Sequence, residues 1–258
     1  MTDFDTSDFS PDAYRSLLRA LGERGYRPGR FDGAAIKGRT ILLRHDIDLS
    51  IDAALSIARI EADEGWTSTY YVLVSSDLYN PASASSRTSL RAICDLGHEI
   101  GLHFDASVYD QPGSDELDIA QLENAAESEC AALSNAIGRD VASISFHRPV
   151  PQLQGLDADF AGRPHSYQPR YFSEIEYCSD SGGQWRHGHP LERASIAAGE
   201  PMQLLTHPVW WSRAGTNIPD KVEAAIQRLT AHSEAEAARN IIPYAEYRAG
   251  ASKEKDRN

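Results

Sequence analysis

The chain has 258 residues, a formal net charge of -13 and three cysteines. An acidic chain lacks the basic surface that nucleic acids and anionic membranes attract, so we expect neither as a partner. The cysteines are odd in number and widely spaced, which excludes a disulfide framework and a structural zinc site.

The chain opens on an acidic stretch, residues 1–6, without the basic start and apolar run of a signal peptide. No later window is long and apolar enough to span a membrane, so we expect a cytoplasmic protein. A first helix is predicted over residues 10–25, where Ser-Pro precedes leucines at helical spacing and a glycine follows. We expect this helix to pack outside the main fold.

Strand-like and helix-like stretches then alternate along the chain. Strands are predicted at residues 40–46, 67–74, 98–104, 141–146, 175–178 and 202–206. Helices are predicted after residues 50, 81 and 114, and a last helix opens at Ile218. Residues 149–171, rich in Pro, Gln and Gly, are predicted to form a long functional loop.

This alternation indicates parallel strands that are joined by right-handed crossovers. At this length we expect one α/β domain over residues 1–258, built as a barrel or a wound sheet. The tail, residues 248–258, is expected to be disordered.

The first predicted strand ends in two carboxylates, within the stretch Leu-Arg-His-Asp-Ile-Asp at residues 43–48. Because side chains alternate along a strand, Asp46 and Asp48 share one face and His45 points to the other. Two like charges side by side repel each other unless a cation or a shared proton compensates. A helix N-cap would account well for Asp48 but poorly for Asp46, so the pair indicates a functional site.

Four further strands also end in ionisable side chains, and parallel strands bring such ends to one edge. These residues are His103 and Asp105, His147 and Arg148, Asp180, and His207. Structural explanations stay open for two of them, since Arg148 can form a salt bridge that only closes a barrel and Asp180 can form a turn. Structural needs alone do not explain five such strand ends in register.

The chemistry of this set is that of a metal-dependent hydrolase. Carboxylates and imidazoles bind zinc and other divalent metals, and three protein ligands leave a position for a water whose pKa falls to about 7. We expect Asp48 and His103 to be metal ligands and Asp46 to be the base. Arg148 is expected to orient a carboxylate, and His207 to protonate the leaving group.

The same stretches resemble, in order, the motifs of the polysaccharide deacetylase (NodB-like) family of metal-dependent carbohydrate esterases. The matching residues are 46–48, 97–103, 146–149, 180–185 and 205–207. The resemblance implies a distorted, incomplete (β/α) barrel, a seven-stranded TIM-like barrel. It also implies one divalent metal ion, Asp46 as base, Asp48 as ligand and His207 as general acid. We assign His147, Asp180 and Trp185 to substrate binding.

One position departs from the family pattern. The second motif of the family carries another metal-binding histidine four residues after the first, and here that residue is Ser107. We expect Asp105, on the strand face of His103, to be the third ligand, with His147 as the second candidate. A carboxylate-rich shell is harder than the usual one, so zinc is expected first and manganese or iron are alternatives.

These features predict a hydrolase that removes an acyl group, expected to be acetyl, from an amino sugar or related amide in surface-glycan metabolism. The substrate is expected to be a small molecule or an oligosaccharide. Two alternatives stay open. One is a non-catalytic relative, favoured by Ser107, that binds a glycan or partner through Trp185, Trp210 and Trp211. The other is a hydrolase of non-sugar C–N bonds.

Overall fold

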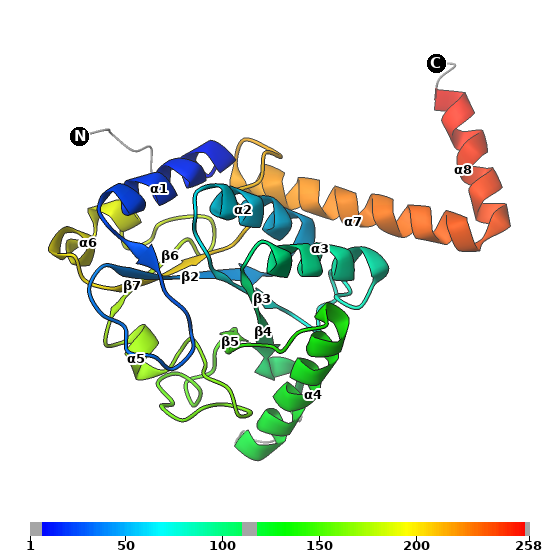
Figure 1. Cartoon of the computed structure of the whole chain (residues 1–258). Helices are drawn as coiled ribbons and strands as arrows, with labels where there is room; N and C mark the ends of the chain where they lie inside the picture. The colour runs from blue at the N-terminus through cyan, green and yellow to red at the C-terminus, as the bar shows by residue number, and fades with distance from the viewer. Residues whose placement is uncertain (1–6, 110–117, 256–258) are drawn as a thin grey trace. The chain divides into compact units, whose positions relative to one another are not determined.

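The computed structural model of the protein describes residues 7–109 and 118–255, and its centre is one parallel sheet (Figure 1). The hydrogen-bonded order is β5-β4-β3-β2-β7-β6, and the two-residue strand β1 pairs with the start of β2. The strands are β1 (Arg27–Pro28), β2 (Thr40–Ile47), β3 (Thr69–Val72), β4 (Glu99–Asp105), β5 (Ile144–His147), β6 (Glu176–Ser179) and β7 (Met202–Thr206).

The sheet curls but does not close. β5 and β6 are its two edges, and in the described part of the chain they are not neighbours in the sheet. The segment after β5 runs along this gap and adds a parallel bridge between His165 and Ile144. The expected distorted, incomplete (β/α) barrel is thereby confirmed.

Helices connect successive strands and cover the outside of the sheet (Figure 1). The longer ones here are α1 (Pro11–Glu23), α2 (Ile51–Asp63), α3 (Ala84–Asp95) and α4 (Ile119–Ile137); α5 (Pro169–Phe172), α6 (Ala194–Ala198) and the 3₁₀ turns η1 (Ala106–Tyr109) and η2 (Pro190–Glu192) are short. A Ser or Asp side chain caps each of the four longer helices by accepting a backbone N–H. The cap of α4 is Asp118, and Ser114, the expected helix start, lies outside the described residues.

The two faces of the sheet have different surroundings. The outer face packs with α2, α3 and α4 into the main apolar core, which includes Ile47, Val72, Leu90, Leu102 and Leu133. Inside the barrel, a smaller cluster of Phe31, Leu42, Tyr71 and Tyr171 forms a closed apolar layer. Alternation along β2 then carries Arg44 and Asp46 on the same inner face as Leu42. The barrel interior therefore changes from apolar to charged towards the carboxyl ends of the strands.

The chain divides into two compact units, residues 1–213 and residues 214–258. The second unit contains α7 (Ile218–Asn240), capped by Asn217, and α8 (Ile242–Lys255), and the ion pair between Arg248 and Glu234 joins the two helices. Of the tail that was expected to be disordered, residues 248–258, α8 includes residues up to Lys255, and residues 256–258 lie outside the described residues. The tail's content of Ala, Glu, Arg and Lys favours helix.

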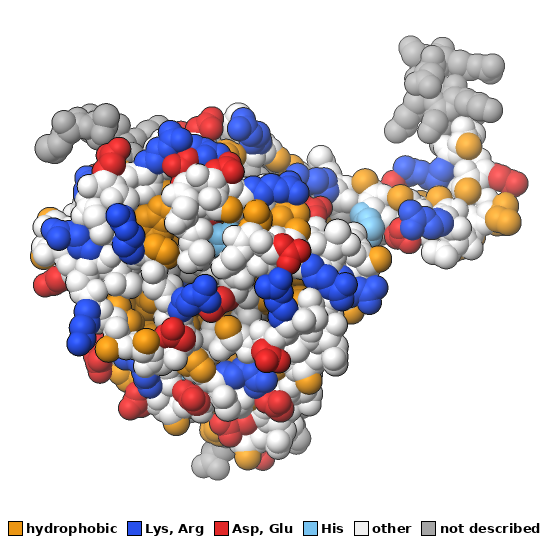
Figure 2. Space-filling model, in the orientation of Figure 1, with side chains coloured by type: hydrophobic (Ala, Val, Ile, Leu, Met, Phe, Trp, Pro, Cys, Tyr) orange, Lys and Arg blue, Asp and Glu red, His pale blue; other side chains and the backbone are white. Residues whose placement is uncertain are grey.

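The outer surface carries both signs of charge. Lysines and arginines are interspersed with acidic side chains over the face that Figure 2 shows. Within the described residues, none of the helices combines the length and apolarity that crossing a bilayer requires.

Candidate metal centre and active site

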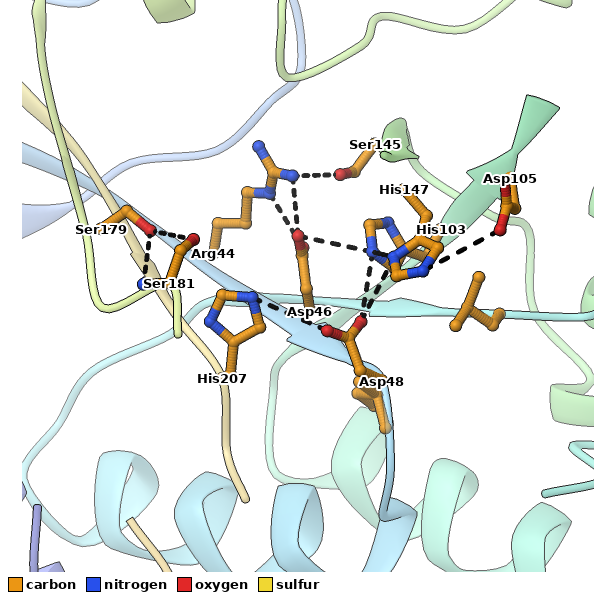
Figure 3. Close-up of polar contacts among 12 residues, drawn as sticks. Arg44, Asp46, Asp48, His103, Asp105, Ser145, His147, Ser179, Ser181 and His207 are labelled. Carbon is orange, nitrogen blue, oxygen red and sulfur yellow. Dashed lines mark hydrogen bonds and ion pairs between the residues drawn. The ribbon is translucent and has the colours of Figure 1, made fainter. Parts of the chain in front are cut away.

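Four strands bring the predicted site residues to one end of the sheet. The central strand β2 is held between β3 and β7 and presents Asp46, with Asp48 directly after it. β4 carries His103, and β5 ends in His147, which pairs in register with Asp105. His207 follows β7. Figure 3 shows Asp48 with His207 on one side and the two histidines of β4 and β5 on the other.

Three donor atoms lie close together at this end of the barrel. Asp48 Oδ1 is 3.4 Å from His103 Nε2 and 3.6 Å from His147 Nδ1. The two histidine nitrogens are 3.2 Å apart. Across the described residues, this is the group of three His, Cys, Asp or Glu side chains whose geometry suits a metal ion.

The donors fit a divalent metal in spacing and in chemistry. Tetrahedral zinc with ligands at about 2.0–2.1 Å separates its donors by about 3.3 Å, close to the three distances observed. Asp48 Oδ1 is also buried and has no hydrogen-bond partner among the described residues. A buried carboxylate oxygen without a donor is costly, and a bound cation removes that cost.

Asp105, the expected third ligand, is not one of these three donors. Its Oδ1 accepts the backbone N–H of Ser107 at 3.0 Å and the Ser107 hydroxyl at 2.6 Å. Its Oδ2 is 3.9 Å from His147 Nε2. His147 thus directs Nδ1 to the three-atom group and Nε2 to a carboxylate, an arrangement common around metal-binding histidines.

Asp46 accepts two hydrogen bonds from Arg44, an arginine that the sequence analysis did not assign to the site. Arg44 Nε donates to Asp46 Oδ1 at 2.9 Å, and Nη2 donates to Oδ2 at 2.8 Å. Burial by itself raises the pKa of Asp46, but the charges of Arg44 and His103 outweigh burial and hold the pKa well below its usual range. Asp46 is therefore ionised, 3.5 Å from His103 Nε2. The available signal was position, since Arg44 stands two residues before Asp46 on one strand face.

Arg148, the arginine expected to orient the base, extends from the edge of the site. Its side chain is 72% exposed, and its Nη1 lies 3.9 Å from Asp105 Oδ2. Its backbone has a φ of 48°, an uncommon conformation for a residue with a Cβ, directly after His147. In the described part of the chain, the ion pairs of Asp46 are with Arg44 and His103.

Asp180 and His207 form a second buried pair. Asp180 accepts the His207 backbone N–H, His207 Nδ1–H at 2.6 Å and Trp211 Nε1–H at 2.8 Å. Burial lowers the pKa of His207, but the charge and hydrogen bond of Asp180 raise it to about 9. His207 is thus protonated at neutral pH, with Nε2 3.8 Å from Asp48 Oδ2. Asp180, expected to bind substrate, is fully buried and fixes His207.

The aromatic residues near the site differ in their surroundings. Trp185 is half-buried and packs with its ring centroid 5.9 Å from that of Phe9 and 6.1 Å from that of Trp211. Trp211 is buried as well. Trp210 is buried too, with its ring centroid 6.2 Å from that of His207.

Comparisons with known proteins find similarity only among solved structures. No family model matches the sequence, and no curated protein is similar to it in sequence. The deacetylase PplD from Streptococcus pyogenes, solved in complex with acetate, has 10% identity and a TM-score of 0.42, over 76% of this chain and 80% of that one.

Two other solved structures have similar values. A family 4 acetyl xylan esterase from Clostridium thermocellum, solved with a cobalt ion, has 14% identity and a TM-score of 0.36, over 74% of this chain and 84% of that one. A family 4 (CE4) pseudoenzyme from Bacillus anthracis has 11% identity and a TM-score of 0.35, over 80% and 64%. The solved structures to which this chain is similar include deacetylases and carbohydrate esterases, the kind of protein that its motifs resemble.

Proposed function

We propose that the protein is a metal-dependent hydrolase that removes an acyl group from a sugar, as a divergent relative of the polysaccharide deacetylases. One observation carries the proposal. Three donor atoms separated by 3.2–3.6 Å lie between an ionised, arginine-held Asp46 and a protonated His207. A base, a metal site and an acid side by side are the parts that hydrolysis of an amide or ester needs.

Asp48, His103 and His147 would hold the metal, with Asp105 behind His147 to fix the orientation of its ring. When bound, the metal would activate water and polarise the acyl carbonyl. Two imidazoles and one carboxylate form a ligand set typical of zinc, and we propose zinc first, with manganese or iron as alternatives.

The remaining residues handle protons. Asp46 accepts a proton from the attacking water, and Arg44 fixes the direction of its carboxylate. His207 carries a proton at neutral pH and donates it from Nε2 to the departing nitrogen or oxygen. Asp180 keeps Nδ1 of His207 protonated and the ring in place. Asp46 is therefore ionised and can act as a base, whereas His207 is protonated and can act as an acid.

The substrate class follows from the resemblance of the motifs rather than from the geometry. We propose an acetylated amino sugar, as a small molecule or an oligosaccharide. An amide outside a sugar is the alternative that the same chemistry allows.

The test combines metal content with acetate release. Elemental analysis of the wild-type protein is expected to find one divalent ion per chain, which Asp48→Ala and His103→Ala both lose. Acetate release from N-acetylated oligosaccharides is expected to stop with a chelator. In Asp46→Asn it is expected to stop while the metal stays bound.

Two results would speak against this proposal. Acetate release that survives both chelation and Asp46→Asn would exclude the mechanism. A metal-loaded protein that hydrolyses neither acetylated sugars nor simple amides, yet binds glycan, would favour a non-catalytic binding function instead.

A further inference from the structure

We propose that Arg44, and not Arg148, positions Asp46 for catalysis. Arg44 lies on the same strand as Asp46, two residues towards its amino end. The inference rests on the proposed function, because it concerns the residue that we assign as its base. The orienting role expected for Arg148, an exposed side chain at the edge of the site, is thereby assigned to the buried Arg44.

Arg44 and Asp46 form a bidentate pair. The Nε and Nη2 of Arg44 face the two oxygens of Asp46 at 2.9 and 2.8 Å, one nitrogen to each oxygen. Two parallel hydrogen bonds fix both the place and the plane of a carboxylate, whereas a single charge fixes only its distance. The lone pairs of Asp46 that face the three-atom group are therefore set by Arg44.

Further hydrogen bonds keep the Arg44 side chain from turning. Its Nη2 also donates to Ser145 Oγ on β5, and its Nη1 donates to Gln203 Oε1 on β7 at 3.2 Å. Gln203 is itself fixed, since its Nε2 donates to the carbonyls of Ser166 and Tyr171. The guanidinium is thus tied to strands on both sides of the open barrel.

Arg44 and Arg148 differ in burial. Arg44 is fully buried, and its guanidinium carbon lies 5.6 Å from the ring centre of Tyr71 and 5.0 Å from that of Tyr167. The rings of Tyr71 and Tyr167 thus contact the guanidinium in a place where water does not compete for its hydrogen bonds. Arg148 has neither property, because its side chain is 72% exposed and its guanidinium lies 3.9 Å from Asp105.

A purely structural role would give the same contacts, so the experiment must separate charge from orientation. Arg44→Lys keeps the positive charge but cannot present two parallel N–H groups to one carboxylate. Arg44→Ala opens a space that guanidinium ion in solution can enter. Arg163→Lys is the matched control, because Arg163 is half-buried and paired with Glu127, and neither residue contributes to the site.

For these variants and Arg148→Ala we would measure metal content and the kinetics of acetate release. Arg44→Lys is expected to keep its metal and its KM while kcat falls about 10²-fold, as for a reacting group displaced by about 1 Å. Added guanidinium is expected to restore part of the kcat of Arg44→Ala and none of that of Asp46→Asn. Arg148→Ala is expected to retain more kcat than Arg44→Lys.

Wild-type kcat in Arg44→Lys would overturn the inference, as would a loss of kcat in Arg148→Ala that exceeds the loss in Arg44→Lys. A loss in Arg163→Lys equal to that in Arg44→Lys would do the same. If the wild-type protein releases no acetate, the proposed function fails, and crystal structures of the wild type and Arg44→Lys decide the inference separately. The expected result is a rotated Asp46 carboxylate with Asp48, His103 and His147 in place, and an unchanged carboxylate would overturn it. If Arg44→Ala does not fold, Arg44→Lys carries the test alone.

Discussion

His147 uses its two ring nitrogens for different purposes, with Nδ1 towards Asp48 and His103 and Nε2 towards Asp105. Removal of a metal ligand abolishes metal binding, whereas removal of a residue that only orients a ligand weakens it. We expect His147→Ala to lose the metal, and Asp105→Asn to bind it about 10–100-fold more weakly with unchanged stoichiometry. Calorimetric titration of the metal-free variants with zinc measures both. Loss of stoichiometric binding in Asp105→Asn alone would make Asp105 the ligand, as first expected from the sequence.

His207 depends on Asp180 for its charge, and this dependence can be measured without metal or substrate. In the metal-free protein we expect the His207 imidazole to titrate near 9, and Asp180→Asn to lower that pKa. NMR spectra of the ring over a pH series provide the measurement. A raised pKa favours the folded state below the pKa of the unfolded chain, about 6.5, and this contribution disappears as the pH rises through about 9. Stability should therefore fall between pH 7 and 10 in the wild type and less in Asp180→Asn. An unchanged His207 pKa in the variant would contradict this account.

At the scale of elements, β2 carries buried ionisable side chains on both of its faces. His45 points away from Asp46 and places Nε2 2.6 Å from Glu61 Oε1 on α2. The hydroxyls of Tyr14, Ser68 and Tyr70 also donate to Glu61, at 2.5–2.7 Å. This network joins α1, α2, β2 and β3 behind the site, so the helices outside the barrel hold the strand that carries the two aspartates.

Removal of Glu61 should therefore loosen the whole outer layer. We expect Glu61→Ala to cost about 3–5 kcal/mol, because a buried charged pair loses one partner. Burial raises the pKa of Glu61, but the charge and hydrogen bond of His45 lower it to about 2. A lowered carboxyl pKa stabilises the fold above its usual value of 4.5, and this contribution is lost as the pH falls towards 2. Denaturant unfolding at pH 7, 4 and 3 should show a larger acid loss in the wild type than in Glu61→Ala, which keeps the lowered pKa of Asp46, and an equal loss in the two proteins would contradict this account.

Strand β4 depends on a residue without a side chain. A Cβ at Gly101 would lie 2.4 Å from a ring carbon of Tyr71 and 2.8 Å from the carbonyl oxygen of Ser143. These neighbours belong to the barrel interior and to the backbone, and neither can move away at low cost. We expect Gly101→Ala to destabilise the protein by about 1–3 kcal/mol in chemical unfolding. A variant as stable as the wild type would show that β4 can shift along its neighbours.

At the scale of the whole molecule, metal binding and folding should be coupled. All the proposed ligands lie in the unit of residues 1–213, and their donor atoms come from separate strands. At free metal about 100-fold above Kd, binding adds about 2.7 kcal/mol, which corresponds to roughly 5–10 °C in Tm. Thermal unfolding with and without zinc measures the shift. Asp48→Asn should show no shift, and an equal shift in that variant would place the bound metal elsewhere.

The sequence by itself was sufficient for the alternation of the six longer strands with the main helices, and for the sheet edge where the proposed site residues gather. Hydrophobic periodicity is a local property, and it predicted β2 and β7 nearly to the residue. Alternation along one strand was enough to place Asp46 and Asp48 on one side and His45 on the other. The paired carboxylates could be read as a site for the same reason, since their repulsion depends only on their spacing.

The identity of each partner was decided only by the tertiary structure. The metal ligation that we propose for His147 and the orienting role that we propose for Arg44 depend on how β5 and β2 meet across the barrel. The spacing of residues along the chain does not predict the distance between side chains of β5 and β2. The left-handed backbone at Arg148 turns its side chain outward, while the neighbouring Ser145 faces Arg44. A motif read in one dimension names the residues present at a strand end, and packing selects which of their atoms point inward.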